Sequence, residues 1–176
     1  MNNRRIGVIT GSSRPHRRSH VLAQQAIDTM SAATPELAFE IIDLAEVSLP
    51  FFDEALPPRS AQYSNEHTKR WAELIDSFDG FVFVVPEYNG SYPAVLKNAI
   101  DYLAAEWRNK PAAIIAYGAS GGASVANFLT ILLERIGMTV LQPTITATTD
   151  VASPAESASL AEHSEALQAL ALALGE

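Results

Sequence analysis

Three short polar segments each follow an apolar run, and they offer different chemistry. GSSRPHRRSH, from Gly11, carries hydroxyls and guanidinium groups; PEYNGSYP, from Pro86, carries two tyrosines among turn-forming residues; GASGGAS, from Gly118, is rich in glycine. Guanidinium groups, hydroxyls and the amides of a helix N-terminus together suit a phosphate dianion. Tyrosine faces, and glycines that let a flat ring approach the main chain closely, suit a planar heterocycle. Together the three segments indicate a mononucleotide site.

The glycine-rich segment also satisfies the pattern G-x-S-x-G between a strand and a helix, which is the setting of a nucleophile elbow. Ser120 would be the nucleophile of a serine hydrolase, and Asp150 and His163 follow it in the hydrolase chain order. However, His163 falls inside a segment with helical periodicity, where a surface histidine is the commoner explanation, and no HGGG-like segment is present. This alternative also leaves the basic first segment unexplained, so we rank it below the nucleotide site.

The elements that must position these segments follow from periodicity, because strand and helix patterns alternate along the chain without a linker or a repeat. Strands are expected at Arg5–Thr10, Phe39–Leu44, Phe81–Val85, Ala112–Gly118 and Val140–Thr148. Helices are expected at about His20–Ala33, Ala61–Ser77 and Pro93–Ala105, from the glycine-rich segment to about Ile136, and from Pro154 onward. FVFVV and AAIIA lack polar alternation, as strands buried on both faces do.

Five strands alternating with five helices predict a parallel sheet covered by helices on both faces, because each crossover is right-handed and covers one face. The expected fold is α/β: a doubly wound three-layer sandwich with a five-stranded parallel sheet, in a single domain over residues 1–176. In such a sheet, ligands bind outside the carboxyl ends of the strands. All three polar segments are expected at this edge.

Composition excludes several other classes of protein. The net charge of −8 argues against a nucleic-acid partner, because a phosphate backbone is bound mainly by clustered Lys and Arg. The absence of cysteine excludes disulfides and thiolate catalysis, and no HExxH or clustered His and Asp spacing suggests a metal site. The N-terminal apolar stretch is too short for a signal peptide, and no run could span a bilayer. We therefore expect a cytoplasmic protein without a membrane partner.

The segments GSSRPHRRS, PEYNGSYPAVLKNAIDYL and YGASGG, in this order and each after a strand, resemble the NADPH-dependent FMN reductase family of flavodoxin-like proteins. This family includes quinone, azo-dye and chromate reductases. The resemblance implies an enzyme with bound FMN that takes hydride from NADPH or NADH. It also implies a small-molecule electron acceptor, such as a quinone, azo compound, flavin or metal ion, and a homodimer or homotetramer.

The resemblance also assigns residues. Those implied for the FMN phosphate are Ser12, Arg14 and Ser19, with Arg18 and His20 as further candidates. Those implied for the ribityl chain and one ring edge are Pro86, Glu87, Tyr88, Asn89 and Gly90. Those implied for the pyrimidine edge, where amides would stabilise negative charge, are Gly118, Ser120, Gly121 and Gly122. The first segment carries PHRR where many members are shorter, so the roles of Arg17, Arg18 and His20 stay open. No catalytic acid or base is assigned, since the cofactor supplies the chemistry.

A flavodoxin-like electron carrier would bind the same cofactor, and the negative charge would suit docking to a redox partner. The first segment lacks the Thr-rich phosphate sequence of flavodoxins, however, and the PEYN segment is typical of the reductases. We rank the carrier third. Among the remaining residues, Glu87 is expected to be held by backbone amides, and Trp71 and Trp107 to serve packing. Asn98 is expected to order the neighbouring loop and a subunit contact.

Overall fold

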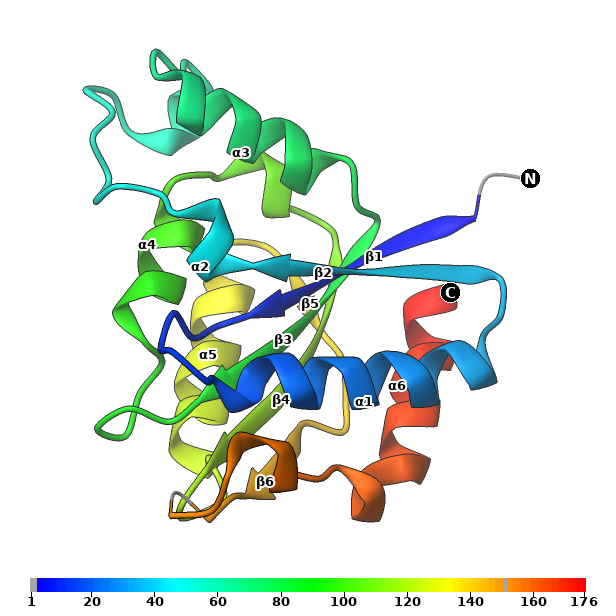
Figure 1. Ribbon diagram of the computed structural model, residues 1–176. Helices are drawn as coiled ribbons and strands as arrows, with labels where there is room; N and C mark the ends of the chain where they lie inside the picture. The colour runs from blue at the N-terminus through cyan, green and yellow to red at the C-terminus, as the bar shows by residue number, and fades with distance from the viewer. Residues whose placement is uncertain (1–2, 151) are drawn as a thin grey trace.

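The computed structural model describes residues 3–150 and 152–176, which form a parallel sheet between two layers of helices (Figure 1). The strands are β1 (Arg4–Thr10), β2 (Leu37–Asp43), β3 (Gly80–Pro86), β4 (Pro111–Gly118), β5 (Thr139–Val140) and β6 (Ile145–Thr148). Their order is β2-β1-β3-β4-β5. Strand β6 also pairs with β4, along the part of β4 that follows its pairing with β5. This order confirms the predicted doubly wound sheet, with its winding reversal between β1 and β3.

The described residues include six α-helices, which flank the sheet. They are α1 (Arg18–Ala33), α2 (Leu44–Val47), α3 (Glu66–Asp76), α4 (Ala94–Asp101), α5 (Ala123–Arg135) and α6 (Ser164–Gly175). Helices α1 and α6 lie side by side on one face, where they pack on Val8, Val82 and Ile115 (Figure 1). Helices α3, α4 and α5 cover the other face and its buried aromatic residues. In the described residues, no helix is long and apolar enough to cross a membrane.

Both tryptophans are buried in the layer between the sheet and α3 and α4. Their rings meet edge to face at 6.2 Å between centroids. Trp71 Nε1 donates a hydrogen bond to the carbonyl oxygen of Ala99 (2.9 Å), and Trp107 Nε1 donates to that of Ile100 (3.2 Å). A buried indole needs such a partner for its N–H group. The packing role predicted for both residues is confirmed.

Several predicted elements differ from the structure. The helix expected from Ala61 begins at Glu66, and the helix expected to reach Ala105 ends at Asp101. Two further differences have clear local causes. The strand expected at Val140–Thr148 consists of two short strands, because Pro143 lies between them and has no N–H group to donate to a ladder. The last helix begins at Ser164 rather than at Pro154. The segment before it forms 3₁₀ turns at Ala155–Ser157 and Ala161–His163, where serine hydroxyls bond to the local main chain and so compete with helical hydrogen bonds.

The long connection between β2 and α3 is held against α4. Asn98 Nδ2 donates to the carbonyl oxygen of Pro50 (2.8 Å), and its Oδ1 accepts a hydrogen bond from Phe52 N (3.0 Å). One turn later, the Tyr102 hydroxyl donates to Asp53 Oδ1 at 3.1 Å, and His67 Nε2 lies 2.8 Å from the same oxygen. These contacts lower the pKa of Asp53 below its usual value, chiefly through His67. Asn98 therefore orders a loop as expected, but that loop is the β2–α3 connection.

Candidate cofactor-binding site

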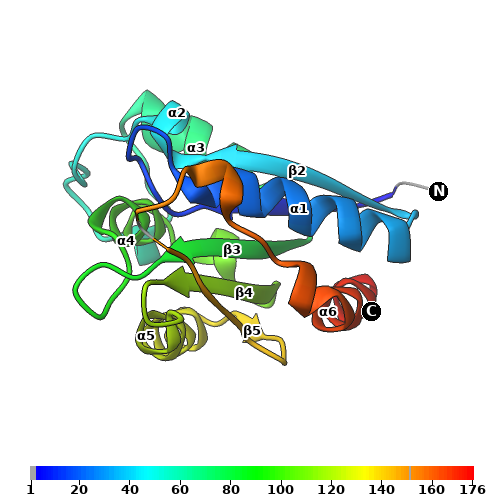
Figure 2. The ribbon, with the colours of Figure 1, turned by 60° about the horizontal axis from the view of Figure 1, so that its bottom comes forward.

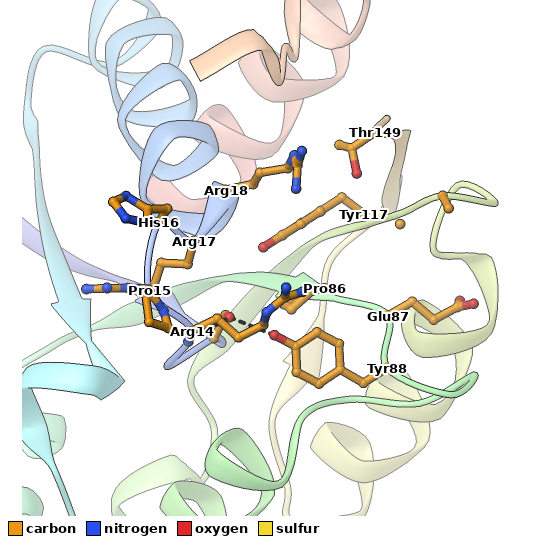
Figure 3. A pocket seen from close by; sticks show the side chains of 13 residues that line it. Arg14, Pro15, His16, Arg17, Arg18, Pro86, Glu87, Tyr88, Tyr117 and Thr149 are labelled. Carbon is orange, nitrogen blue, oxygen red and sulfur yellow. Dashed lines mark hydrogen bonds between the residues drawn. The ribbon is translucent and has the colours of Figure 1, made fainter. Parts of the chain in front are cut away.

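A pocket of about 190 Å³ lies at the carboxyl ends of β1, β3 and β4 (Figure 3). Its lining comes from four segments: Ser12 with residues 14–18, residues 86–88, residues 117–119, and Thr149. The first three segments are those that the sequence singled out. The pocket is therefore at the predicted edge of the sheet, where the loops after parallel strands converge.

The pocket contains half of the residues expected to bind a cofactor. Those that line it are Ser12, Arg14, Arg18, Pro86, Glu87, Tyr88 and Gly118. Those outside its lining are Ser19, His20, Asn89, Gly90, Ser120, Gly121 and Gly122. Most of the second set shape the loops around the pocket.

The three arginines of the loop after β1 have different partners. Arg17 Nη2 pairs with Asp43 Oδ2 at the end of β2, which fastens the loop to the sheet. Arg18 Nη2 donates to the main-chain oxygens of Asp150, at 2.8 Å, and of Ser153. The exposed Arg14 side chain has no acceptor among the described residues, so its guanidinium group can bind a ligand.

The start of α1 lacks several hydrogen-bond partners. Arg17 occupies the N-cap position, and its side chain caps none of the first helical amides. The hydroxyl of Ser19 is fully buried and has no hydrogen-bond partner among the described residues. Such a buried hydroxyl is costly, and free amides at a helix N-terminus attract anions. His20 is instead turned toward the Asp43 carboxylate, 4.0 Å from its Nδ1.

The loop after β3 is a tight hairpin. Tyr88 N donates to the main-chain oxygen of Ser91 (2.8 Å), and Ser91 N donates back to that of Tyr88 (3.0 Å). Asn89 and Gly90 form the turn between them, with φ values of 51° and 77°, as an Asn-Gly pair favours. Ser124 Oγ, in α5, donates to the carbonyl oxygen of Gly90 at 2.8 Å. The apolar strand ends in polar residues because they build this turn, which presents the Tyr88 side chain.

Tyr88 also connects two walls of the pocket, since its hydroxyl lies 2.9 Å from Ser12 Oγ (Figure 3). Glu87 points the other way, and its Oε2 accepts a hydrogen bond from Val125 N at 3.3 Å. The carboxylate therefore lies at the start of α5, where negative charge is favourable. This confirms that a backbone amide holds Glu87.

The loop after β4 folds back on its own strand. Gly122 has a φ of 75°, and a Cβ there would lie 2.8 Å from Tyr117 N. A Cβ at Gly118 would lie 3.1 Å from the Cβ of Glu87. Glycine is therefore required at these two positions for packing within the loop. The close approach of a flat ligand ring, expected from the sequence, would be a second reason.

Tyr117 and Thr149 line the pocket, although neither was assigned a site role from the sequence. Tyr117 lies on β4, with its hydroxyl directed toward the loop after β1 (Figure 3). Burial raises the pKa of Tyr117 to about 12, which nearby Ser19 partly opposes, so the phenol stays a proton donor at neutral pH. The sequence feature that could have indicated Tyr117 is its position near the carboxyl end of an apolar strand, where its hydroxyl can reach the ligand edge of the sheet. Thr149 follows β6, and its amide donates to the Gly118 carbonyl oxygen at 3.0 Å.

The possible hydrolase residues do not form a triad. The Asp150 carboxylate accepts hydrogen bonds from Ala152 N (2.9 Å) and Ser153 Oγ (2.6 Å). His163 Nε2 lies 3.6 Å from Glu162 Oε1, and no hydrogen bond among the described residues joins Ser120, Asp150 and His163. A working triad needs its base hydrogen-bonded to the other two groups. The structure gives this alternative no support.

The sheet order and the pocket define a flavodoxin-like α/β protein. The sequence pattern of the family described as NADPH-dependent FMN reductase matches residues 4–152, and the chain belongs to this family. An NAD(P)H-dependent FMN reductase, ntnL, of Nectria sp is 37% identical over 171 residues, which cover 92% of this chain and 85% of the relative. One of Schizosaccharomyces pombe is 41% identical over 147 residues, covering 82% and 72%.

A solved structure shows the same likeness in three dimensions. It is FerB, described as a flavoenzyme NAD(P)H:(acceptor) oxidoreductase, from Paracoccus denitrificans. The TM-score is 0.75 at 25% sequence identity, and the match covers 98% of this chain and 95% of FerB. The oxidoreductase class and the flavodoxin-like fold expected from the sequence are thus confirmed.

Proposed function

We propose that this protein binds FMN in the pocket between β1, β3 and β4, and uses NADPH or NADH to reduce a small-molecule acceptor such as a quinone or an azo compound. The observation that carries the proposal is the pairing of two features in one pocket. At one wall, Arg14, whose guanidinium group has no acceptor among the described residues, lies near the uncapped start of α1. At the other wall, a rigid hairpin presents Tyr88. The family of the chain makes FMN the ligand to test first.

The residues at the α1 end fit the phosphate of FMN. The Ser19 hydroxyl lies outside the pocket lining but has no hydrogen-bond partner among the described residues, and a phosphate at the start of α1 would supply one. Arg14 would add a charged hydrogen bond, and the first amides of α1 would add the positive end of the helix dipole. Ser12 and the phenol of Tyr117 lie in the same lining and can donate to further oxygens. The nearby Asp43 carboxylate would not repel a phosphate strongly, because it is paired with Arg17.

The residues at the other end fit a flat ring. The pocket of about 190 Å³ is smaller than the 300–1,000 Å³ usual for a whole ligand. The ring would therefore lie at the mouth, against the hairpin and the loop after β4, with one face open. NAD(P)H and the acceptor would then use the same open face in turn.

Bound FMN would supply the redox chemistry, accepting a hydride and passing electrons on. The contribution of the chain is to hold and orient. In the loop after β4, Gly121 N donates to the Gly118 carbonyl oxygen, whereas the amides of Ala119, Ser120 and Gly122 have no acceptor among the described residues. These fixed dipoles would stabilise negative charge at the ring edge. Glu87, bonded at the start of α5, would keep that loop in place.

The test is the visible absorbance of the purified protein reconstituted with FMN and mixed with NADPH or NADH without oxygen. We expect rapid bleaching of the bound yellow flavin and recovery of the colour on adding benzoquinone. Flavin that binds but resists both nucleotides would indicate an electron carrier instead. Failure to bind flavin at all would overturn the proposal.

We also propose a location and an oligomeric state for the protein: a homodimer or homotetramer in the cytoplasm. Support comes from the family resemblance. Light scattering with size-exclusion chromatography would show two or four chains of 19.0 kDa. A monomeric mass would contradict the oligomer.

A further inference from the structure

A second cavity, of about 500 Å³, adjoins the proposed flavin pocket. Arg18 and Thr149 line both cavities, so the two are neighbours that share part of their lining. The rest of the lining comes from the end of β6 and the segment that crosses the start of α1: residues 148, 150, 153, 157–159, 161 and 162. Figure 2 shows this segment passing in front of α1. The second cavity thus adjoins the end of the pocket proposed for the phosphate.

The lining of the second cavity suits a nucleoside. It combines the hydroxyls of Ser157 and Ser159 with the carboxylate of Glu162, whose side chain is 79% exposed. Hydroxyl and carboxylate oxygens are the groups that bind the vicinal hydroxyls of a ribose. Ala158 and Ala161 add small apolar surfaces against which a purine can lie. A free phosphate dianion is disfavoured in this cavity, because the carboxylates of Glu162 and Asp150 both belong to its lining and Arg18 is the one cationic residue of that described lining.

The residue between the cavities suits a pyrophosphate. Arg18 Nη2 donates to the main-chain oxygens of Asp150 and Ser153, whereas its Nε and Nη1 have no acceptor among the described residues. A guanidinium group offers five N–H donors in a planar fork. Arg18 can therefore keep the crossing segment in place and still bind phosphoryl oxygens. The side chain lines both cavities and would meet the bridge between two nucleotide halves.

We propose that the second cavity holds the adenosine half of FAD, so that this protein accepts FAD as well as FMN. The inference rests on the proposed function, because it places the flavin half in the same pocket. Arg18 would bind the pyrophosphate, and Glu162 would accept hydrogen bonds from the ribose. The adenosine half of NAD(P)H is the weaker candidate. Its nicotinamide must reach the open ring face, whereas the second cavity adjoins Arg18 at the α1 end.

The test compares dissociation constants of the full chain, freed of flavin, for FMN and FAD by quenching of flavin fluorescence. Ser157→Trp fills the second cavity from an exposed 3₁₀ turn, and Glu162→Gln removes the ribose acceptor charge. Ala169→Trp, on the exposed side of α6, is the matched control for a bulky surface residue. In the unmodified protein we expect FAD to bind at least as tightly as FMN.

Ser157→Trp should weaken FAD binding about tenfold or more, which is about 1.4 kcal/mol, because the indole would take the place of the nucleoside; FMN binding should be unchanged. Glu162→Gln should weaken FAD binding by a smaller factor, and Ala169→Trp should change neither. FMN binding without FAD binding would overturn the inference while leaving the proposed function intact. Equal losses of FMN and FAD in Ser157→Trp would also overturn it, as would a loss confined to NADH or NADPH affinity of the FMN-loaded protein. Binding of neither flavin would overturn both proposals.

Discussion

The two loops that face each other across the pocket are built in different ways. The loop after β3 is closed by its own main-chain hydrogen bonds between Tyr88 and Ser91 and is tied to α5 through Ser124. Among the described residues, the loop after β1 has no such reciprocal main-chain pair. Gly11 N donates to the carbonyl oxygen of Val84, and the other contacts of the loop involve side chains, such as the bond of Ser12 to Tyr88 and the pair of Arg17 with Asp43.

This difference indicates that the two loops contribute to ligand binding in different ways. A loop fixed before the ligand arrives loses little conformational entropy on binding, and it suits a ring that needs a defined position. A loop in which the guanidinium group of Arg14 has no acceptor among the described residues can bind a ligand without first breaking a contact, and it suits a phosphate. Substitutions in the loop after β3 should therefore lower the stability of the fold, and substitutions of Arg14 in the loop after β1 should lower the affinity for the flavin.

The largest effect is expected from Gly122→Ala in the loop after β4, which is closed by a main-chain hydrogen bond as the loop after β3 is. The new Cβ would meet the backbone of Tyr117 in a left-handed conformation, which should cost about 2–4 kcal/mol of stability. Urea unfolding measures this cost. Gly121→Ala is the control, because its Cβ approaches only Thr148 Oγ1, at 3.6 Å, and should cost about 1–2 kcal/mol. Equal costs would show that the fold-back of this loop on β4 is not tight.

Arg14→Ala in the other wall should have the reverse pattern. FMN affinity should fall by about 1.5–3 kcal/mol, the value of a charged hydrogen bond, and stability without flavin should stay the same. Titration calorimetry and urea unfolding give the two numbers. Arg17→Ala is the contrasting variant, since it leaves the buried Asp43 carboxylate unpaired and should lower stability. Unchanged affinity in Arg14→Ala would remove Arg14 from the phosphate site.

A smaller effect is expected in the hairpin turn. Asn89→Ala should lower stability by about 1 kcal/mol, because alanine tolerates the φ of 51° less well than asparagine does. Asn89→Gly should be close to neutral, since glycine adopts this conformation freely. Thermal unfolding compares the two. If both variants lose the same stability, the asparagine side chain rather than its backbone matters.

The smallest effect concerns the segment that Arg18 holds. Hydrogen bonds from Ser153 and Ala152 lower the pKa of Asp150 below its usual value. A lowered pKa means that its contribution is complete above the usual Asp value of about 3.9 and is lost as the pH falls through the lower folded value. The difference in unfolding free energy between the natural protein and Asp150→Asn should be constant from pH 5 to 8 and shrink below about pH 4. A difference that grows on acidification would contradict this sign.

The sheet and the position of the pocket could be predicted because they depend on patterns within each segment. Apolar runs such as FVFVV give buried strands, and their carboxyl ends must share one edge. The contacts of Arg17 and Arg18 could not be predicted, because their partners, Asp43 and the Asp150 main chain, come from distant parts of the sequence. The start of α6 was missed for a local reason, namely serine hydroxyls that compete with helical hydrogen bonds.

The division of the last predicted strand into β5 and β6 also protects the protein in solution. An exposed edge of a sheet is a template on which another chain can add a strand, and long, flat edges promote aggregation. Beside β4, that edge holds only two residues in β5 and four in β6, with Pro143 between them. A foreign strand would find no continuous row of amides there. Replacing Pro143 would lengthen this row and so raise the tendency of the protein to self-associate through its sheet.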